Sequence, residues 1–171
     1  GNAWEKFPIQ AGETWQAGTG RVAVHDITQP LPPFMKEADC LFIDPPWNLG
    51  NLNSFYTKAG RDDYHSSFGR FADIFFQRVA EVGPAVCYIE IGNQNVADWT
   101  ARLSALYPVV QHWPVFYYRK HPTNIIRGGT SMTEIDLTGM DEVECINLIA
   151  WFESYRVIGD LCMGRGLVGA A

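Results

Sequence analysis

The feature that most constrains the fold is a short apolar run that stops abruptly at two prolines. Residues 38–43 read Ala-Asp-Cys-Leu-Phe-Ile, and Asp44-Pro45-Pro46-Trp47 follows directly. A near-continuous apolar run of this length is typical of a buried strand in a parallel sheet. Proline cannot donate to a sheet ladder, so the strand must end here. The sequence therefore predicts a buried strand with a carboxylate and a flat aromatic ring at its mouth. The plainer alternative, in which the prolines only end the strand and Trp47 packs over the turn, stays open.

Strand and helix patterns alternate along the rest of the chain. Apolar and β-branched runs predict strands, and apolar residues at helical spacing predict helices. We expect strands at 21–27, 38–43, 85–91, 109–118, 123–127 and 156–161, and helices at 71–82, 95–107 and 140–155. Pro114 places its strand near a sheet edge or at a bulge. This order indicates an α/β layered sheet, in which ligands bind outside the carboxyl ends of the strands. Asp26, Asp44 and Asp160 stand at or near such ends, so we expect them at one rim.

Composition places the chain among globular proteins. Its 171 residues fit one domain over 1–171, with 1–20 as an N-terminal extension and no insertion large enough for a second domain. No apolar stretch reaches the ~18 residues of a membrane span, and the start carries no signal-peptide pattern. The four cysteines are scattered, with neither a CxxC pair nor a suitably spaced histidine. We therefore expect a cytoplasmic protein with reduced thiols, no membrane partner and no metal site.

Charge is distributed unevenly along the chain. The net charge of −6 argues against strong nonspecific binding to nucleic acid. Between Asp98 and Glu134, however, there is no acidic residue, and this stretch contains Arg102, Arg119, Lys120 and Arg127. The segment Arg119-Lys120-His121-Pro122 could meet a phosphate backbone. A solvated charged face gives the same pattern, so both interpretations stay open.

A second motif lies at the other end of the chain. Asp160-Leu161-Cys162-Met163-Gly164-Arg165-Gly166 follows a predicted strand and leads into the start of a helix. Glycines let a ligand approach the backbone closely, and a helix N-terminus presents free N–H groups to a carboxylate. Tight packing of the strand on the helix would also account for such a turn. The motif becomes informative only in combination with the tetrad at Asp44.

Together the two motifs resemble the amino-group methyltransferases that use S-adenosylmethionine, specifically the adenine-N6 class with its Asp-Pro-Pro-aromatic signature. In the circularly permuted branch of that family the tetrad comes first and the glycine motif last, as it does here. His25-Asp26-Ile27 also looks like the acidic position that precedes the family's catalytic strand. The resemblance covers about residues 22–50 and 157–171 and implies a circularly permuted, Rossmann-like methyltransferase sheet with helices on both faces.

The resemblance also implies a role for each motif residue. Asp44 and the main-chain carbonyl of Pro45 would accept hydrogen bonds from the adenine amino group, Pro46 would fix the turn, and Trp47 would stack on a base that is flipped out or single-stranded. The remaining residues would form the cofactor site. Asp26 would bind the cofactor's adenine, Ile27 would pack on that ring, and the turn around Gly164 and Gly166 would cradle the methionyl or ribose part together with Asp160, Cys162 and Arg165. Asp26 as a plain turn carboxylate and Arg165 as a solvent-facing residue are the alternatives.

The expected activity is transfer of a methyl group from S-adenosylmethionine to adenine N6 in DNA. RNA is a serious rival, because the Trp47 variant of the tetrad also occurs in RNA-adenine enzymes. Cytosine-N4 is disfavoured, because that class usually has Ser in place of Asp44. A methyltransferase-like binding module without activity is the competitor from another class. A homodimer or a specificity partner also stays open.

The permuted family places further strands after the glycine motif, whereas this sequence ends soon after Gly169. Either the chain is truncated or its sheet is smaller than usual, and truncation is our hypothesis.

Overall fold

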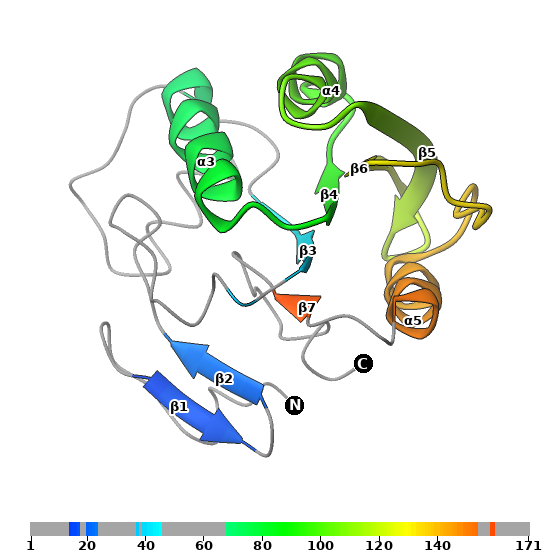
Figure 1. Cartoon of the computed structure of the whole chain (residues 1–171). Helices are drawn as coiled ribbons and strands as arrows, with labels where there is room; N and C mark the ends of the chain where they lie inside the picture. Colours follow the sequence, from blue (N-terminus) through cyan, green and yellow to red (C-terminus); the bar gives the residue numbers. More distant parts are fainter. Residues whose placement is uncertain are drawn as a thin grey trace, which may run out of the picture.

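The computed structural model describes residues 14–17, 20–23, 37, 39–45, 68–153 and 158–159. Five strands form the main sheet: β3 (Cys40–Ile43), β4 (Val86–Ile91), β5 (Val109–Tyr117), β6 (His121–Gly129) and β7 (Ile158–Gly159). Their order across the sheet is β5-β6-β4-β3-β7. The described helices are α3 (Phe68–Val82), α4 (Val96–Ser104) and α5 (Glu142–Phe152). The α/β class expected from the sequence is confirmed at this level (Figure 1).

The sheet is mixed, with one strand running against the others. β3 pairs in parallel with both β4 and β7, whereas β6 is antiparallel to its neighbours β4 and β5. Consequently β5 runs in the same direction as β3, β4 and β7. These four strands end at the same end of the sheet, which we call the carboxyl end.

Side chains alternate between two cores, one on each face of the sheet. Leu41 and Ile43 of β3 pack with residues of α3 and α4, including Phe75 and Trp99. Cys40 and Phe42 point the other way and belong to the cluster that contains Ile146 of α5. Figure 1 shows the same division, with α3 and α4 on one side of the strands and α5 on the other. Each of these helices therefore covers one face of the sheet.

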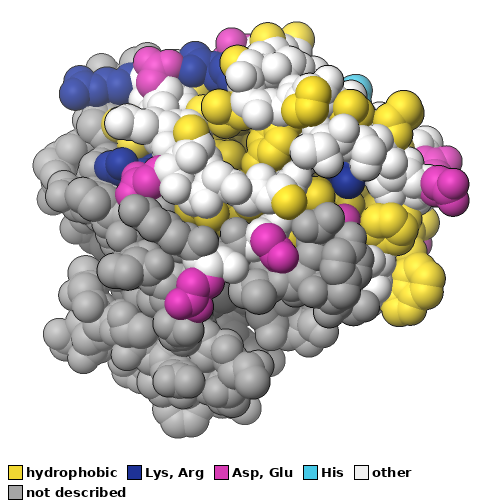
Figure 2. All heavy atoms as spheres, viewed as in Figure 1, with side chains coloured by type: hydrophobic (Ala, Val, Ile, Leu, Met, Phe, Trp, Pro, Cys, Tyr) yellow, Lys and Arg dark blue, Asp and Glu magenta, His cyan; other side chains and the backbone are white. Residues whose placement is uncertain are grey.

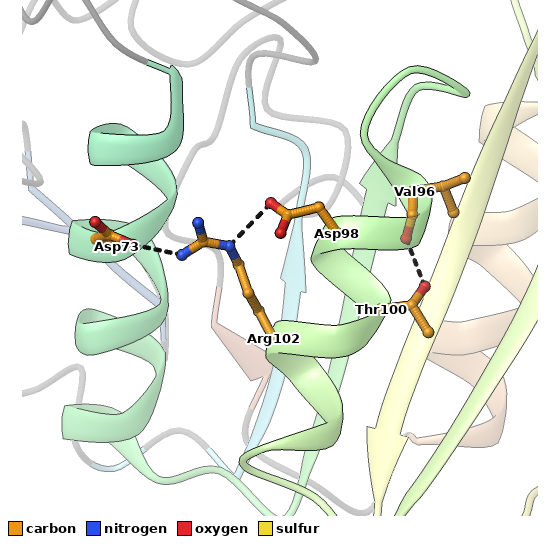
Figure 3. A network of polar contacts seen from close by, with 5 residues as sticks. All are labelled: Asp73, Val96, Asp98, Thr100 and Arg102. Carbon is orange, nitrogen blue, oxygen red and sulfur yellow. Dashed lines mark hydrogen bonds and ion pairs between the residues drawn. The ribbon is translucent and has the colours of Figure 1, made fainter.

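An ion-pair network connects the two helices of the first face. Arg102 of α4 donates to Asp73 of α3 over 2.6 Å and to Asp98 in its own helix over 3.0 Å (Figure 3).

The burial of a continuous apolar side explains why the helices form. In α3 the buried residues recur at helical spacing, and Gly83, with φ of +62°, ends the helix.

The last described helix, α5, is apolar on more than its inner side. Ile146 and Ile149 are buried against the sheet, but Trp151 remains 73% exposed and Val143 53% exposed. Figure 2 shows hydrophobic side chains at the surface on the right of the view, where α5 lies in Figure 1. None of the helices in the described ranges is both long and apolar enough to cross a membrane.

Several expected elements differ in extent or placement from those in the structure. The strand expected at 21–27 appears as β2 (Gly20–Ala23), which pairs antiparallel with β1 (Thr14–Ala17) in a separate two-stranded sheet. β1 lies within the stretch taken as an N-terminal extension. The strand expected at 123–127 extends over His121–Gly129, because its pairing with β5 continues to the turn of a hairpin. β5 lies at the sheet edge, as Pro114 predicts.

Candidate functional site

Asp44 stands at the carboxyl end of the sheet, directly after β3. It is half-buried, and Pro45 after it is buried. Cys40 and Phe42 point toward α5, and Asp44 continues their alternation along the chain. Its position past the strand on the α5 face agrees with the prediction of a carboxylate at the strand's mouth. Pro46 and Trp47, the other half of the tetrad, lie outside the described residues.

Two further carboxylates lie beside Asp44, and sequence reasoning missed both. The register that pairs Ile43 with Ile89 brings Asp44 next to Glu90 of β4. Glu90 is 1% exposed, and Glu142, the first residue of α5, is 8% exposed. One ligand atom from each of the three residues lies within 4.8 Å of the other two. We call this group the carboxylate cluster.

The start of α5 is held in place by contacts on both sides. Asp141 caps the helix by accepting a hydrogen bond from the Glu144 N–H over 3.0 Å. The Phe116 N–H donates to the Met140 carbonyl over 2.9 Å, which joins the entry of α5 to β5. The Glu144 N–H, with a further contribution from the Arg119 guanidinium, holds the pKa of Asp141 below its usual value. These contacts fix the first turn of α5 and, with it, Glu142.

The carboxylate cluster can serve several kinds of chemistry. Three carboxylates this close repel one another unless a proton, a cation or a positively charged group lies among them. Carboxylate oxygens are the ligands that magnesium and calcium prefer. Their arrangement therefore suits a divalent cation, although the sequence predicted no metal site. The same oxygens can accept hydrogen bonds from an amino group.

A second polar group secures the chain as it leaves β4. The Asn124 side-chain amide donates to the Ile91 carbonyl over 3.1 Å and to the Asn93 Oδ1 over 2.8 Å. Thr123 also donates to the Ile91 carbonyl, and His112 Nε2 lies 2.6 Å from Asn124 Oδ1. Thr123 and Asn124 are both buried. Side chains of β6 thus fix the chain where it leaves β4. β4 is the neighbour of β3, the strand that leads to Asp44.

The strand that precedes the glycine motif lies directly beside the strand of the tetrad. β7 pairs in parallel with β3, with Ile158 opposite Cys40 and Gly159 opposite Leu41. The structure therefore brings together the two strands that precede the predicted motifs. The predicted cofactor residues lie outside the described ranges: Asp26, Ile27, Asp160, Cys162, Gly164, Arg165 and Gly166.

One of the missed residues leaves a signal in the sequence and the other does not. Glu90 is the single charge in the apolar run Ala85–Ile91, and a glutamate is almost never fully buried without partners. That mismatch marks a functional or strongly constrained position. Glu142 gives no such signal, because an acidic residue in a first helical turn is accounted for by the helix dipole.

Comparison with known proteins gives no match to a protein-family model, to a curated protein or to a solved structure. The class of protein is therefore defined by the fold and by the candidate site alone. The chain is an α/β protein with a mixed sheet, and three carboxylates from the end of β3, from β4 and from the start of α5 cluster at the carboxyl end of that sheet.

Proposed function

We propose that this protein transfers a methyl group from S-adenosylmethionine to the N6 amino group of adenine in DNA. The parallel pairing of β7 with β3 is the observation that carries the proposal. The glycine segment follows β7 in the sequence, and the Asp-Pro-Pro-Trp tetrad follows β3. Two motifs from opposite ends of the chain thus follow neighbouring strands that end at the same end of the sheet. A methyl donor and its acceptor need this proximity.

The two strands are close enough for one ligand to contact the segments that follow both of them. Neighbouring strands lie about 4.8 Å apart, so a ligand held by the segment after β7 would extend to Asp44. Such a ligand would contact the predicted cofactor residues: Asp26, Ile27, Asp160, Cys162, Gly164, Arg165 and Gly166. S-adenosylmethionine, when bound, supplies an electrophilic methyl group on its sulfonium sulfur.

Asp44 and Pro45 would prepare the acceptor nitrogen. The lone pair of an adenine amino group is delocalised into the ring, which makes the nitrogen a poor nucleophile. The Asp44 carboxylate and the Pro45 carbonyl would each accept one amino hydrogen, which favours tetrahedral geometry at nitrogen and frees its lone pair. Trp47 would stack on the base and align it. After alkylation the nitrogen loses a proton readily, and Asp44, with Glu90 and Glu142 beside it, offers oxygens to receive that proton.

Two measurements on the purified protein test the proposal. Calorimetry should detect binding of S-adenosylmethionine, and mass spectrometry of nucleosides should detect N6-methyladenine in DNA incubated with protein and cofactor. N6-methyladenine in RNA alone would move the assignment to RNA, and N4-methylcytosine would overturn the choice of base. Absence of cofactor binding would contradict the enzyme and favour the binding module.

The variant Asp44→Ala separates catalysis from cofactor binding. We expect it to abolish methylation, because the amino group loses its principal acceptor, while cofactor affinity stays within about fivefold of wild type. Glu134→Ala removes a carboxylate from an exposed position outside the helices and strands and is the matched control, which should methylate normally. A parallel loss of cofactor affinity in Asp44→Ala would assign Asp44 to the cofactor site or to the fold.

A further inference from the structure

The turn between β5 and β6 has an unusual backbone for its sequence. Lys120 N–H donates to the Tyr117 carbonyl over 3.2 Å, which closes a β-turn with Tyr118 and Arg119 at its centre. Both central residues have positive φ, 50° for Tyr118 and 60° for Arg119. Positive φ at both positions is the pattern of a type I′ turn, which strongly favours Asn-Gly. We call residues 117–121 the hairpin tip.

The side chains of the hairpin tip therefore occupy positions that their backbone disfavours. A bulky residue with positive φ costs stability compared with glycine or asparagine. Strained backbone positions of this kind cluster at functional sites. Here the two side chains are an aromatic ring and a guanidinium group. That pair is suited to stacking on a base and to contact with a phosphate.

The hairpin tip lies at the carboxyl end of the sheet, as Asp44 does. β5 runs parallel to β3 and β4, so its last residue, Tyr117, is at the end where those strands finish. Arg119 Nε lies 3.1 Å from the Asp141 carboxylate, and Asp141 directly precedes Glu142 of the carboxylate cluster. The contact joins the hairpin tip to the start of α5. The tip thus lies at the same end of the sheet as the proposed site of methyl transfer, with β6 and β4 between β5 and the strand that leads to Asp44.

The hairpin tip is exposed and carries positive charge. The Arg119 side chain is 85% exposed, Tyr118 is 52% exposed, and Lys120 and His121 are exposed as well. The strands that form the hairpin contain no acidic residue. In a chain of net charge −6 this is a local site for an anion rather than part of a general basic surface.

We propose that the hairpin tip is a docking site for the DNA strand that carries the target adenine. Arg119 and Lys120 contact phosphates beside the target nucleotide, and Tyr118 stacks on a neighbouring base. The proposal rests on the proposed function, since it takes DNA as the partner. It assigns binding of the strand to a part of the chain separate from Asp44 and from the glycine segment.

Binding of a fluorescein-labelled DNA strand, measured by anisotropy over a series of salt concentrations, tests this assignment. Phosphate contacts release counterions, so the plot of log affinity against log salt should be less steep by about 0.7 for each contact to a single strand that is removed. We expect Arg119→Gln with Lys120→Gln to lower the affinity about tenfold and to make the slope shallower by about 1.4. Arg78→Gln is the control, because it removes a charge from the C-terminal half of α3, which packs on the face of the sheet opposite α5. This control should stay within about threefold of wild type, because charges more than about 10 Å away are screened.

Asp141→Asn should change binding in the opposite direction. Asparagine caps a helix as well as aspartate does, so α5 keeps its N-cap while Arg119 loses its anionic partner. With Arg119 released toward phosphate, we expect DNA to bind about threefold more tightly. Loss of a negative charge can also tighten binding directly, so the gain is assigned to Arg119 only if Asp141→Asn gives none when it is added to Arg119→Gln. Unchanged or weaker binding by this variant would contradict the role of Arg119.

A variant with the residues that this turn prefers separates the effect on DNA binding from the effect on folding. Tyr118→Asn with Arg119→Gly supplies the residues that the turn prefers, so the melting temperature should rise or stay unchanged. DNA affinity should nevertheless fall about tenfold, because the ring and one charge are gone. A stable variant that binds DNA as wild type does would overturn the docking site.

Methylation assays on the same proteins distinguish failure of this proposal from failure of the proposed function. Binding through the hairpin tip without methylation of any nucleic acid would leave the docking site standing and contradict the enzyme. Methylation of DNA by hairpin variants with wild-type affinity would leave the enzyme standing and contradict the docking site. Tighter binding of an RNA strand of the same sequence would contradict DNA as the docked strand.

Discussion

Tyr88 links two charged residues inside the core on the α5 face. Its hydroxyl donates to Glu153 over 3.1 Å and accepts from Arg127 Nε over 3.2 Å. All three residues are buried, and the Arg127 guanidinium carbon lies 5.7 Å from the centre of the Tyr88 ring. Burial raises the pKa of the Tyr88 hydroxyl, so it stays protonated and can donate. One hydroxyl thus joins β4, β6 and the end of α5.

Removing that hydroxyl should destabilise the protein more than removing a hydroxyl elsewhere. We expect Tyr88→Phe to lower the free energy of unfolding by about 2 kcal/mol, because a hydrogen bond is lost at each of two buried charged groups. Tyr107→Phe is the control, since its hydroxyl donates only to the neutral Pro84 carbonyl, over 2.8 Å, and should cost about 1 kcal/mol. Urea denaturation measures both. Equal losses would mean that the charged partners add nothing to the Tyr88 contacts.

The stability of α5 depends on the contacts of its first turn. The Asp141 carboxylate caps the helix, and its pKa is held below the usual value by the Glu144 N–H and by Arg119. A carboxylate with a lowered pKa stabilises the fold above its unfolded-state pKa, near 3.9. That stabilisation is lost as the pH falls through the lower, folded-state value. The helix that places Glu142 is therefore weakened in acid.

The variants Asp141→Ala and Asp141→Asn separate the cap from the charge. At neutral pH we expect Asp141→Ala to cost about 1 kcal/mol and Asp141→Asn less, because asparagine still accepts from the Glu144 N–H. As the pH falls below about 4, the deficit of Asp141→Asn should shrink toward zero, because aspartate itself becomes neutral. Urea denaturation at several pH values measures the difference. A constant deficit at every pH would exclude the charge as its cause.

The sequence pattern predicts which segments form helices and strands better than it predicts the residues at which they begin and end. α3, α4 and α5 all lie within or overlap the expected helices, because their buried sides repeat at helical spacing. The hairpin tip could not be predicted, since Tyr118-Arg119 contains neither the asparagine nor the glycine that marks such a turn. Glu90 left a signal in its apolar strand, whereas the position of Glu142 follows from how α5 packs on the sheet. The local pattern of apolar residues predicts helices and strands, but long-range packing determines which of their side chains come into contact.

Two hydrophobic cores share one sheet. The strand order β5-β6-β4-β3-β7 could not be derived from the sequence, because β3 and β7 are far apart in the chain and pair through only two residues each. Cys87 of β4 faces α3 and α4, whereas Cys145 of α5 faces the opposite side of the sheet. Both thiols are fully buried, so each reports whether its own face has opened.

If the two cores unfold together, Cys87 and Cys145 should become reactive at the same urea concentration. Burial, reinforced by the charge of Glu90, raises the pKa of Cys145 to about 12, and burial raises that of Cys87 as well. Neither thiol should therefore react with iodoacetamide until the structure opens, because the thiolate is the reactive form. A Cys162→Ser background removes the remaining cysteine that lies outside the described residues, and mass spectrometry of peptides resolves the others. Labelling of Cys145 well before Cys87 would show that α5 detaches on its own and takes Glu142 of the carboxylate cluster with it. Labelling of both thiols at the same urea concentration would establish that the two faces of the sheet unfold as one cooperative unit. The site at the carboxyl end would then belong to that unit.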